Sequence, residues 1–93
     1  MTLLSDSEIE ARLAGLQGWA RVGAAIAKEF DRGDFVGSAG FVSALVEPAE
    51  GMNHHPDLEI SWGTVKVTIS THSEGGLTAA DFELAAKVDA LAA

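Results

Sequence analysis

Three histidines are the residues of this chain best suited to do chemistry, and two of them are adjacent. His54 and His55 stand directly before Pro56, while His72 lies further along the chain. Glu50 precedes His54 by four residues, which is about one turn of a helix. An unperturbed imidazole titrates at a pH of about 6.5, so it can serve as an acid or a base near neutral pH. These residues predict a site for proton transfer or for ligand binding.

Pro56 indicates how two neighbouring imidazoles could reach one pocket. A proline disfavours helical geometry at the residue before it, here His55. We therefore expect the helix that carries Glu50 and His54 to end there and the chain to continue in an extended conformation. Asp81 joins this group only if the fold brings the start of a later helix to the same place.

The same residues also have plainer interpretations. Two histidines at a helix end would suit the helix dipole. The three histidines with Glu50 could instead bind zinc, although adjacent histidines are an uncommon ligand spacing. His72 alone would suit an exposed strand end, Trp62 a packed turn, and Asp81 the acidic position of a capping box. The chain contains no cysteine and no nucleophile elbow or phosphate-binding glycine motif.

Hydrophobic periodicity places these residues in an α+β domain. The predicted elements are a helix that begins at residue 5, a hairpin over 19–30, a long helix over 34–53, a hairpin over 57–72 and a final helix from residue 78. Their order is αββαββα, which predicts a four-stranded antiparallel sheet with the helices packed on one face. We expect residues 1–93 to form a single domain.

The long predicted helix presents one apolar face with a spacing of three or four residues. Its members are Phe35, Ala39, Val42, Leu45, Ala49 and Met52. Pro48 lies inside this helix and is expected to kink its last turns.

The second hairpin has a predicted register. With Trp62 and Gly63 as the turn, Leu58 pairs with Val67 and apolar residues face apolar residues throughout. This register places His72 at the end of a strand, on its polar side. In the final helix the predicted core positions are Phe82, Leu84, Ala85, Val88 and Leu91.

Composition excludes several classes of protein. Six basic residues against fourteen acidic ones leave a net charge of −8, which disfavours direct binding to nucleic acid. The apolar runs are too short for a membrane span. The N-terminus lacks the basic and apolar regions of a signal peptide, and the absence of cysteine fits a reducing compartment, so we expect a cytoplasmic protein.

The spacing of the polar residues resembles that of the pterin-4a-carbinolamine dehydratases. The matching positions are Glu50, the His54-His55-Pro56 motif, Trp62, His72 and Asp81, and the resemblance extends to Leu-Gln-Gly-Trp at 16–19 and Ser-Thr-His at 70–72. It therefore covers nearly the whole chain. Pro48 departs from the family pattern, which has a helix former there, and Trp62 carries a larger ring than usual.

The resemblance implies a hydro-lyase that converts 4a-hydroxytetrahydropterin to quinonoid dihydropterin without a metal or an organic cofactor. It implies that His54, His55 and His72 are the catalytic histidines and that Glu50 holds His54 in one tautomer. His54 and His72 would transfer protons. The substrate-binding residues that it implies are His55, Pro56, Trp62 and Asp81.

The resemblance also bears on partners. Family members form dimers or tetramers, so we expect a homo-oligomer, and an aromatic amino-acid hydroxylase would supply the substrate. Some relatives instead bind transcription factors or help assemble other enzymes. A non-catalytic binding or assembly module is therefore the alternative function.

Overall fold

The structure is a computed structural model that describes residues 2–93. The elements are α1 (Asp6–Leu13), β1 (Ala20–Val22), β2 (Ala25–Asp31), α2 (Phe35–Met52), β3 (Asp57–Ser61), β4 (Thr64–Ile69), the short 3₁₀ helix η1 (His72–Glu74) and α3 (Ala79–Ala92). The predicted order αββαββα is confirmed, with η1 added between the last strand and the last helix. The fold is α+β.

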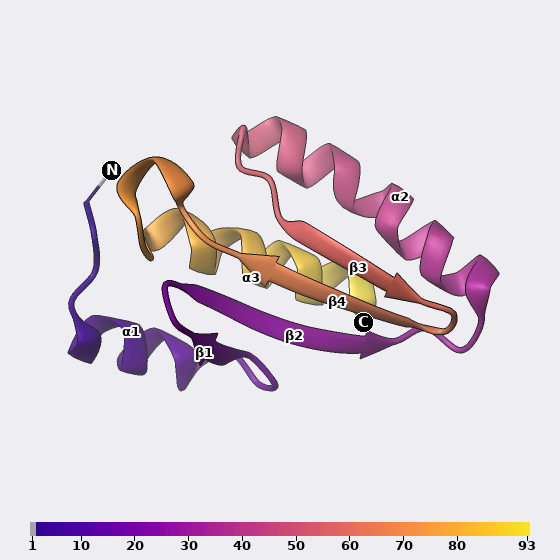
Figure 1. Ribbon diagram of the computed structural model, residues 1–93, viewed down its shortest axis with the longest axis horizontal. Coiled ribbons are helices and arrows are strands. Elements are labelled where there is room, and N and C mark those ends of the chain that lie inside the picture. The colour runs from indigo at the N-terminus through magenta and orange to yellow at the C-terminus, as the bar shows by residue number, and fades with distance from the viewer. Residues whose placement is uncertain (1) are drawn as a thin grey trace.

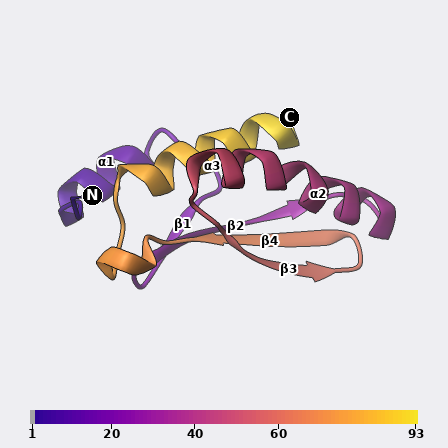
Figure 2. The ribbon, with the colours of Figure 1, turned by 90° about the horizontal axis from the view of Figure 1, so that it is seen from above.

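The four strands form one antiparallel sheet in the order β1-β2-β4-β3. The helices lie on one face of this sheet, as Figure 2 shows when the molecule is seen from above. The predicted register of β3 on β4 is confirmed, with Leu58 opposite Val67 and Glu59 opposite Lys66. Trp62 adopts a left-handed conformation, with φ of 48°, in the turn between these strands.

The buried side chains form one hydrophobic cluster between the sheet and the helices. The sheet contributes Ile26, Phe30, Val65, Val67 and Ile69, and the helices contribute Ile9, Phe41, Leu45, Phe82, Leu84, Ala85 and Val88. Because apolar and polar residues alternate along β4, one of its faces is fully buried while the other is polar.

The buried face of α2 is rotated from the prediction at its first turns. Ser38 and Phe41 are buried there, whereas Phe35 is 60% exposed and Ala39 is also exposed. The rotation has a local cause, because the Ser38 hydroxyl donates a hydrogen bond to the Trp62 carbonyl oxygen at 2.7 Å and thus faces the hairpin. Hydrophobic periodicity could not predict this contact, because it considers only the apolar residues of the helix.

Two further predictions concern Pro48 in α2 and Leu91 in α3. Pro48, which was predicted to kink the last turns of the helix, does not interrupt α2, which continues as far as Met52. The prediction that Leu91 of α3 is a core residue is wrong: its exposed fraction is 43%, since Val88 and Ala92 form the stripe that faces the core.

The carboxylate of Asp89 joins α3 to the first hairpin. It accepts hydrogen bonds from the indole N–H of Trp19 at 3.0 and 3.1 Å and pairs with the Lys28 ammonium at 2.9 Å. Lys28 also donates to the Gln17 carbonyl oxygen at 2.9 Å. This partly buried network holds the C-terminal helix in place on the sheet.

Candidate active site

The end of α2 determines where His54 and His55 point. Asn53 adopts a left-handed conformation with φ of 50°. Its N–H bonds to the Glu50 carbonyl at 3.1 Å, and the His54 N–H bonds to the Ala49 carbonyl at 3.0 Å. This pair of bonds is a Schellman motif, for which asparagine is one of the few suitable residues at the left-handed position. The expectation that Pro56 ends the helix is wrong, because Asn53 ends it and Pro56 leads into β3.

His54 is directed into the protein and pairs with a residue far along the chain. Its side chain is 8% exposed, and its Nε2 lies 2.7 Å from Oδ1 of Asp81, which is fully buried. The prediction that Glu50 holds His54 is wrong, because the turn at Asn53 carries His54 away from the helical position above Glu50 and toward the start of α3.

Asp81 has two roles. As predicted, it is the acidic residue of a capping box at the start of α3, where its Oδ2 accepts a hydrogen bond from the Thr78 N–H at 2.8 Å. The same oxygen accepts a bond from the Thr71 hydroxyl at 2.8 Å. Thr71 was not predicted as a site residue, and its position directly before His72 was the only signal that could have indicated it.

His55 pairs with Glu50 on the surface. Its Nε2 contacts a carboxylate oxygen of Glu50, and the imidazole is 54% exposed. The pair borders a pocket of about 210 Å³ between α2 and β3. The lining residues are Val42, Leu45, Val46, Ala49, Glu50, His55, Pro56 and Leu58. His55 and Pro56 thus lie beside an apolar pocket, while His54 does not line it.

His72 is not the end of a strand, as had been expected, but the first residue of η1. β4 ends at Ile69, and Thr71 pairs with Gly76 across the loop that follows. The His72 side chain is 70% exposed, and its Nε2 lies 3.8 Å from Oδ2 of Asp57. Asp57 was also missed, although the predicted register, extended by one pair, places it opposite Thr68 near the end of β4.

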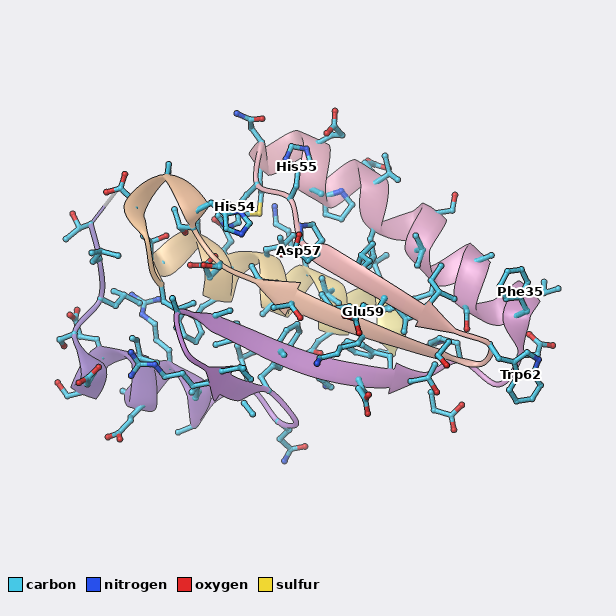
Figure 3. The ribbon with its side chains drawn as sticks, viewed as in Figure 1. Phe35, His54, His55, Asp57, Glu59 and Trp62 are labelled. Atoms are coloured by element: carbon cyan, nitrogen blue, oxygen red, sulfur yellow. The ribbon has the colours of Figure 1, made fainter. Side chains whose placement is uncertain are left out.

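Each histidine therefore has its own carboxylate partner, and the residues come from the end of α2, the start of β3, η1 and the start of α3. Figure 3 shows His54, His55 and Asp57 at the end of the sheet where β3 begins. Within residues 2–93, no three His, Asp or Glu side chains are grouped closely enough to hold a metal ion. An imidazole that is paired with a carboxylate has a defined orientation and can give or take a proton.

Trp62 lies elsewhere. It is 70% exposed in the β3–β4 turn, and Figure 3 shows it near Phe35, at the opposite end of the β3–β4 hairpin from His54 and His55. β3 runs from Asp57 to Ser61, and at about 3.3 Å per residue Trp62 is roughly 20 Å from Pro56. Within one chain, Trp62 and the histidines cannot contact the same small molecule.

Replacing Trp62 with alanine should therefore leave KM for a small substrate bound at the histidines within about twofold of the wild-type value, because a ligand held there does not reach this turn. Steady-state kinetics of Trp62→Ala and of the matched variant Phe35→Ala would check this. A KM raised more than tenfold by Trp62→Ala alone would mean that Trp62 reaches a site on another subunit.

The fold and the site together define a class of protein. It is an α+β protein with helices packed against a four-stranded antiparallel sheet (Figure 1). Histidine–carboxylate pairs lie at one end of that sheet. No helix among residues 2–93 is long and apolar enough to cross a membrane.

Residues 2–91 match the family described as pterin 4 alpha carbinolamine dehydratase, and the chain belongs to that family. A protein of Thermosynechococcus vestitus with the provisional name pterin-4-alpha-carbinolamine dehydratase is 49% identical over 96% of this chain and 94% of its own length. A protein of Nostoc with the same provisional name is 48% identical over 92% of each chain.

Two solved structures share the fold. A protein from Brucella melitensis, described as a transcriptional coactivator/pterin dehydratase, superposes with a TM-score of 0.95 at 36% identity and covers 99% of this chain and 100% of its own. A pterin dehydratase-like protein, described as a RuBisCO assembly factor in the alpha-carboxysome, has a TM-score of 0.65 at 25% identity, with coverage of 80% and 86%.

Proposed function

We propose that this protein is a hydro-lyase that dehydrates 4a-hydroxytetrahydropterin to quinonoid dihydropterin and water. The observation that carries the proposal is the pairing of each of its three histidines with a separate carboxylate in a member of this family. Such pairs suit a reaction that consists only of proton transfers and the loss of water.

The reaction balances with one acid and one base. A protonated imidazole gives its proton to the hydroxyl at C4a as the C4a–O bond breaks and the bonding electrons leave with oxygen, so that water departs. A neutral imidazole takes the proton from N5, and the N5–H electron pair forms the N5=C4a double bond. The elimination changes no oxidation state overall, so the proposal includes no cofactor.

The histidines have different environments, which supports different roles. In the proposal, His54, buried against Asp81, is the base, and the exposed His72 beside Asp57 is the acid. His55 and Glu50 border the apolar pocket and orient the substrate there together with Pro56.

The test is stopped-flow absorbance of freshly generated 4a-hydroxytetrahydropterin with and without the protein. The protein should accelerate loss of the carbinolamine well beyond free imidazole at three times the protein concentration, which controls for simple buffer catalysis. A rate no greater than that of free imidazole, with protein shown to be folded by circular dichroism, would overturn the proposal.

The alternative is a binding or assembly module. The relative described as a RuBisCO assembly factor supports it, and the relative from Brucella melitensis is described both as a coactivator and as a pterin dehydratase. Both functions use the same fold, and the kinetic test separates them. A folded protein without dehydratase activity would favour the alternative.

We also propose that the protein is a homodimer or homotetramer that acts in the cytoplasm on the product of an aromatic amino-acid hydroxylase. Two surfaces support self-association: β3 is an edge strand with Ile60 exposed, and α2 exposes Phe35, Val36 and Val46. Light scattering should give two or four times the mass of one chain. The mass of a single chain at micromolar concentration would contradict this part of the proposal.

A further inference from the structure

We infer that Asp81, held by Thr71 and Thr78, keeps His54 in the tautomer that carries its proton on Nε2, so that Nδ1 is the proton acceptor of the site. Thr71 is then a positioning residue that acts through Asp81. This inference deepens the proposed function, and its catalytic part rests on that function.

With Asp81 ionised, the hydrogen bonds around its carboxylate have one consistent direction. The Thr71 hydroxyl donates to Asp81 Oδ2 at 2.8 Å. A hydroxyl has a single proton, so the 2.8 Å bond between the Thr71 and Thr78 hydroxyls must be donated by Thr78. Since the Thr78 N–H also donates to Oδ2, this oxygen accepts two hydrogen bonds from neighbouring groups.

The other carboxylate oxygen then determines the tautomer of His54. Oδ1 lies 2.7 Å from Nε2, and an ionised carboxylate can only accept a hydrogen bond. Nε2 therefore donates, and in the neutral imidazole Nδ1 holds the free lone pair.

The bond to Asp81 uses only one of the two ring nitrogens of His54. The side chain is 8% exposed, so a small part of it reaches the surface. In the inference, Nδ1 is the atom that meets the substrate proton.

The surroundings make this arrangement rigid. Thr71, Thr78 and Asp81 are all buried, and Thr71 is further held by its N–H bond to the Gly76 carbonyl at 3.0 Å. Buried hydrogen-bond networks in which every member is satisfied specify a single geometry. Because Thr71 directly precedes His72, the same residue anchors the chain at both proposed proton-transfer histidines.

Asp81→Asn is the decisive variant. The two donors at Oδ2 should hold the amide oxygen there, so that the amide NH₂ faces His54 and donates to Nε2. His54 would then carry its proton on Nδ1. Long-range ¹H–¹⁵N correlation spectra at a pH where His54 is neutral should show the Nε2–H tautomer in the wild type and the Nδ1–H tautomer in Asp81→Asn. We expect kcat to fall by about 10–10³-fold, because the basic nitrogen is blocked, while KM changes less than about threefold.

Thr71 supplies the second test. Thr71→Val removes the hydroxyl at nearly constant volume and should lower kcat by about tenfold, with signals of both tautomers, because one hydrogen bond to Asp81 is lost. Thr71→Ser should restore kcat to within about threefold of the wild type, since its hydroxyl can donate in the same way. Thr64→Val, on the polar side of β4 at the end of the strand far from His54 and His72, is the matched control and should change neither the spectra nor kcat.

The outcomes are distinct. An Nδ1–H tautomer in the wild-type protein would overturn the inference, because Asp81 would then carry a proton. An Nε2–H tautomer that Asp81→Asn does not alter would also overturn it. If the tautomer reverses as expected but the wild type does not accelerate dehydration, the proposed function fails while the structural assignment of His54 holds.

Discussion

Replacing His54 with alanine should lower kcat by about 10²–10⁴-fold, which is the typical contribution of a group that transfers a proton in the transition state. His54 is the most sequestered of the three histidines and pairs with the buried Asp81. The measurement is the single-turnover decay of 4a-hydroxytetrahydropterin, with the folded state checked by circular dichroism.

A matched variant separates chemistry from stability in this experiment. Removing the imidazole leaves Asp81 without one partner, and an unpaired buried charge is destabilising. In His54→Gln, the side-chain amide can donate to Asp81 but is not a base at neutral pH. Both variants should lose activity, and His54→Gln should be the more stable. Turnover within about threefold of the wild type in His54→Gln would remove His54 from the mechanism.

Replacing Phe30 with alanine should lower the free energy of unfolding by about 3–5 kcal/mol, the usual cost of truncating a buried phenylalanine. The Phe30 ring is buried between Trp19 and Phe41, with centroid distances of 6.0 and 5.1 Å. The ammonium group of Lys28, which is also on β2, lies 4.9 Å from the centroid of the Phe30 ring. Truncation therefore opens a cavity where the first hairpin and α2 meet.

Urea unfolding would measure this effect as a lower midpoint with an unchanged m-value. Val22→Ala is the control, because Val22 is 59% exposed on β1 and outside the surfaces proposed for self-association, and it should change the free energy of unfolding by no more than about 0.5 kcal/mol. Equal losses in the two variants would contradict the assignment of Phe30 to the core.

The division between buried and exposed histidines has a consequence for mechanism. His54 is fixed by a buried network, while His55 and His72 pair with carboxylates on the surface. Exposed ion pairs contribute little free energy, so His55 and His72 can change partners when a substrate binds. His54 cannot do so without disrupting the start of α3.

Local patterns in the sequence predicted most of the fold. The order of elements, the register of β3 on β4 and the capping box of Thr78 and Asp81 are all confirmed. Each of these features depends on residues that are near one another in the chain or on strict alternation across a tight turn. Glu50 and His54 are four residues apart, but the predicted pairing of these two residues was wrong. His54 pairs with Asp81, and Glu50 pairs with His55.

Tertiary structure alone decided the partners of the histidines. One left-handed residue, Asn53, turns the chain so that His54 faces α3 and His55 returns to Glu50. Spacing rules assume that the helix continues, so they cannot report a partner 27 residues away such as Asp81. The sequence by itself determined which titratable side chains the protein has and how far apart they lie along the chain. The packing of α3 against the end of α2 decided which histidine is buried and which carboxylate holds it, because burial and long-range hydrogen bonds exist only when these elements are assembled.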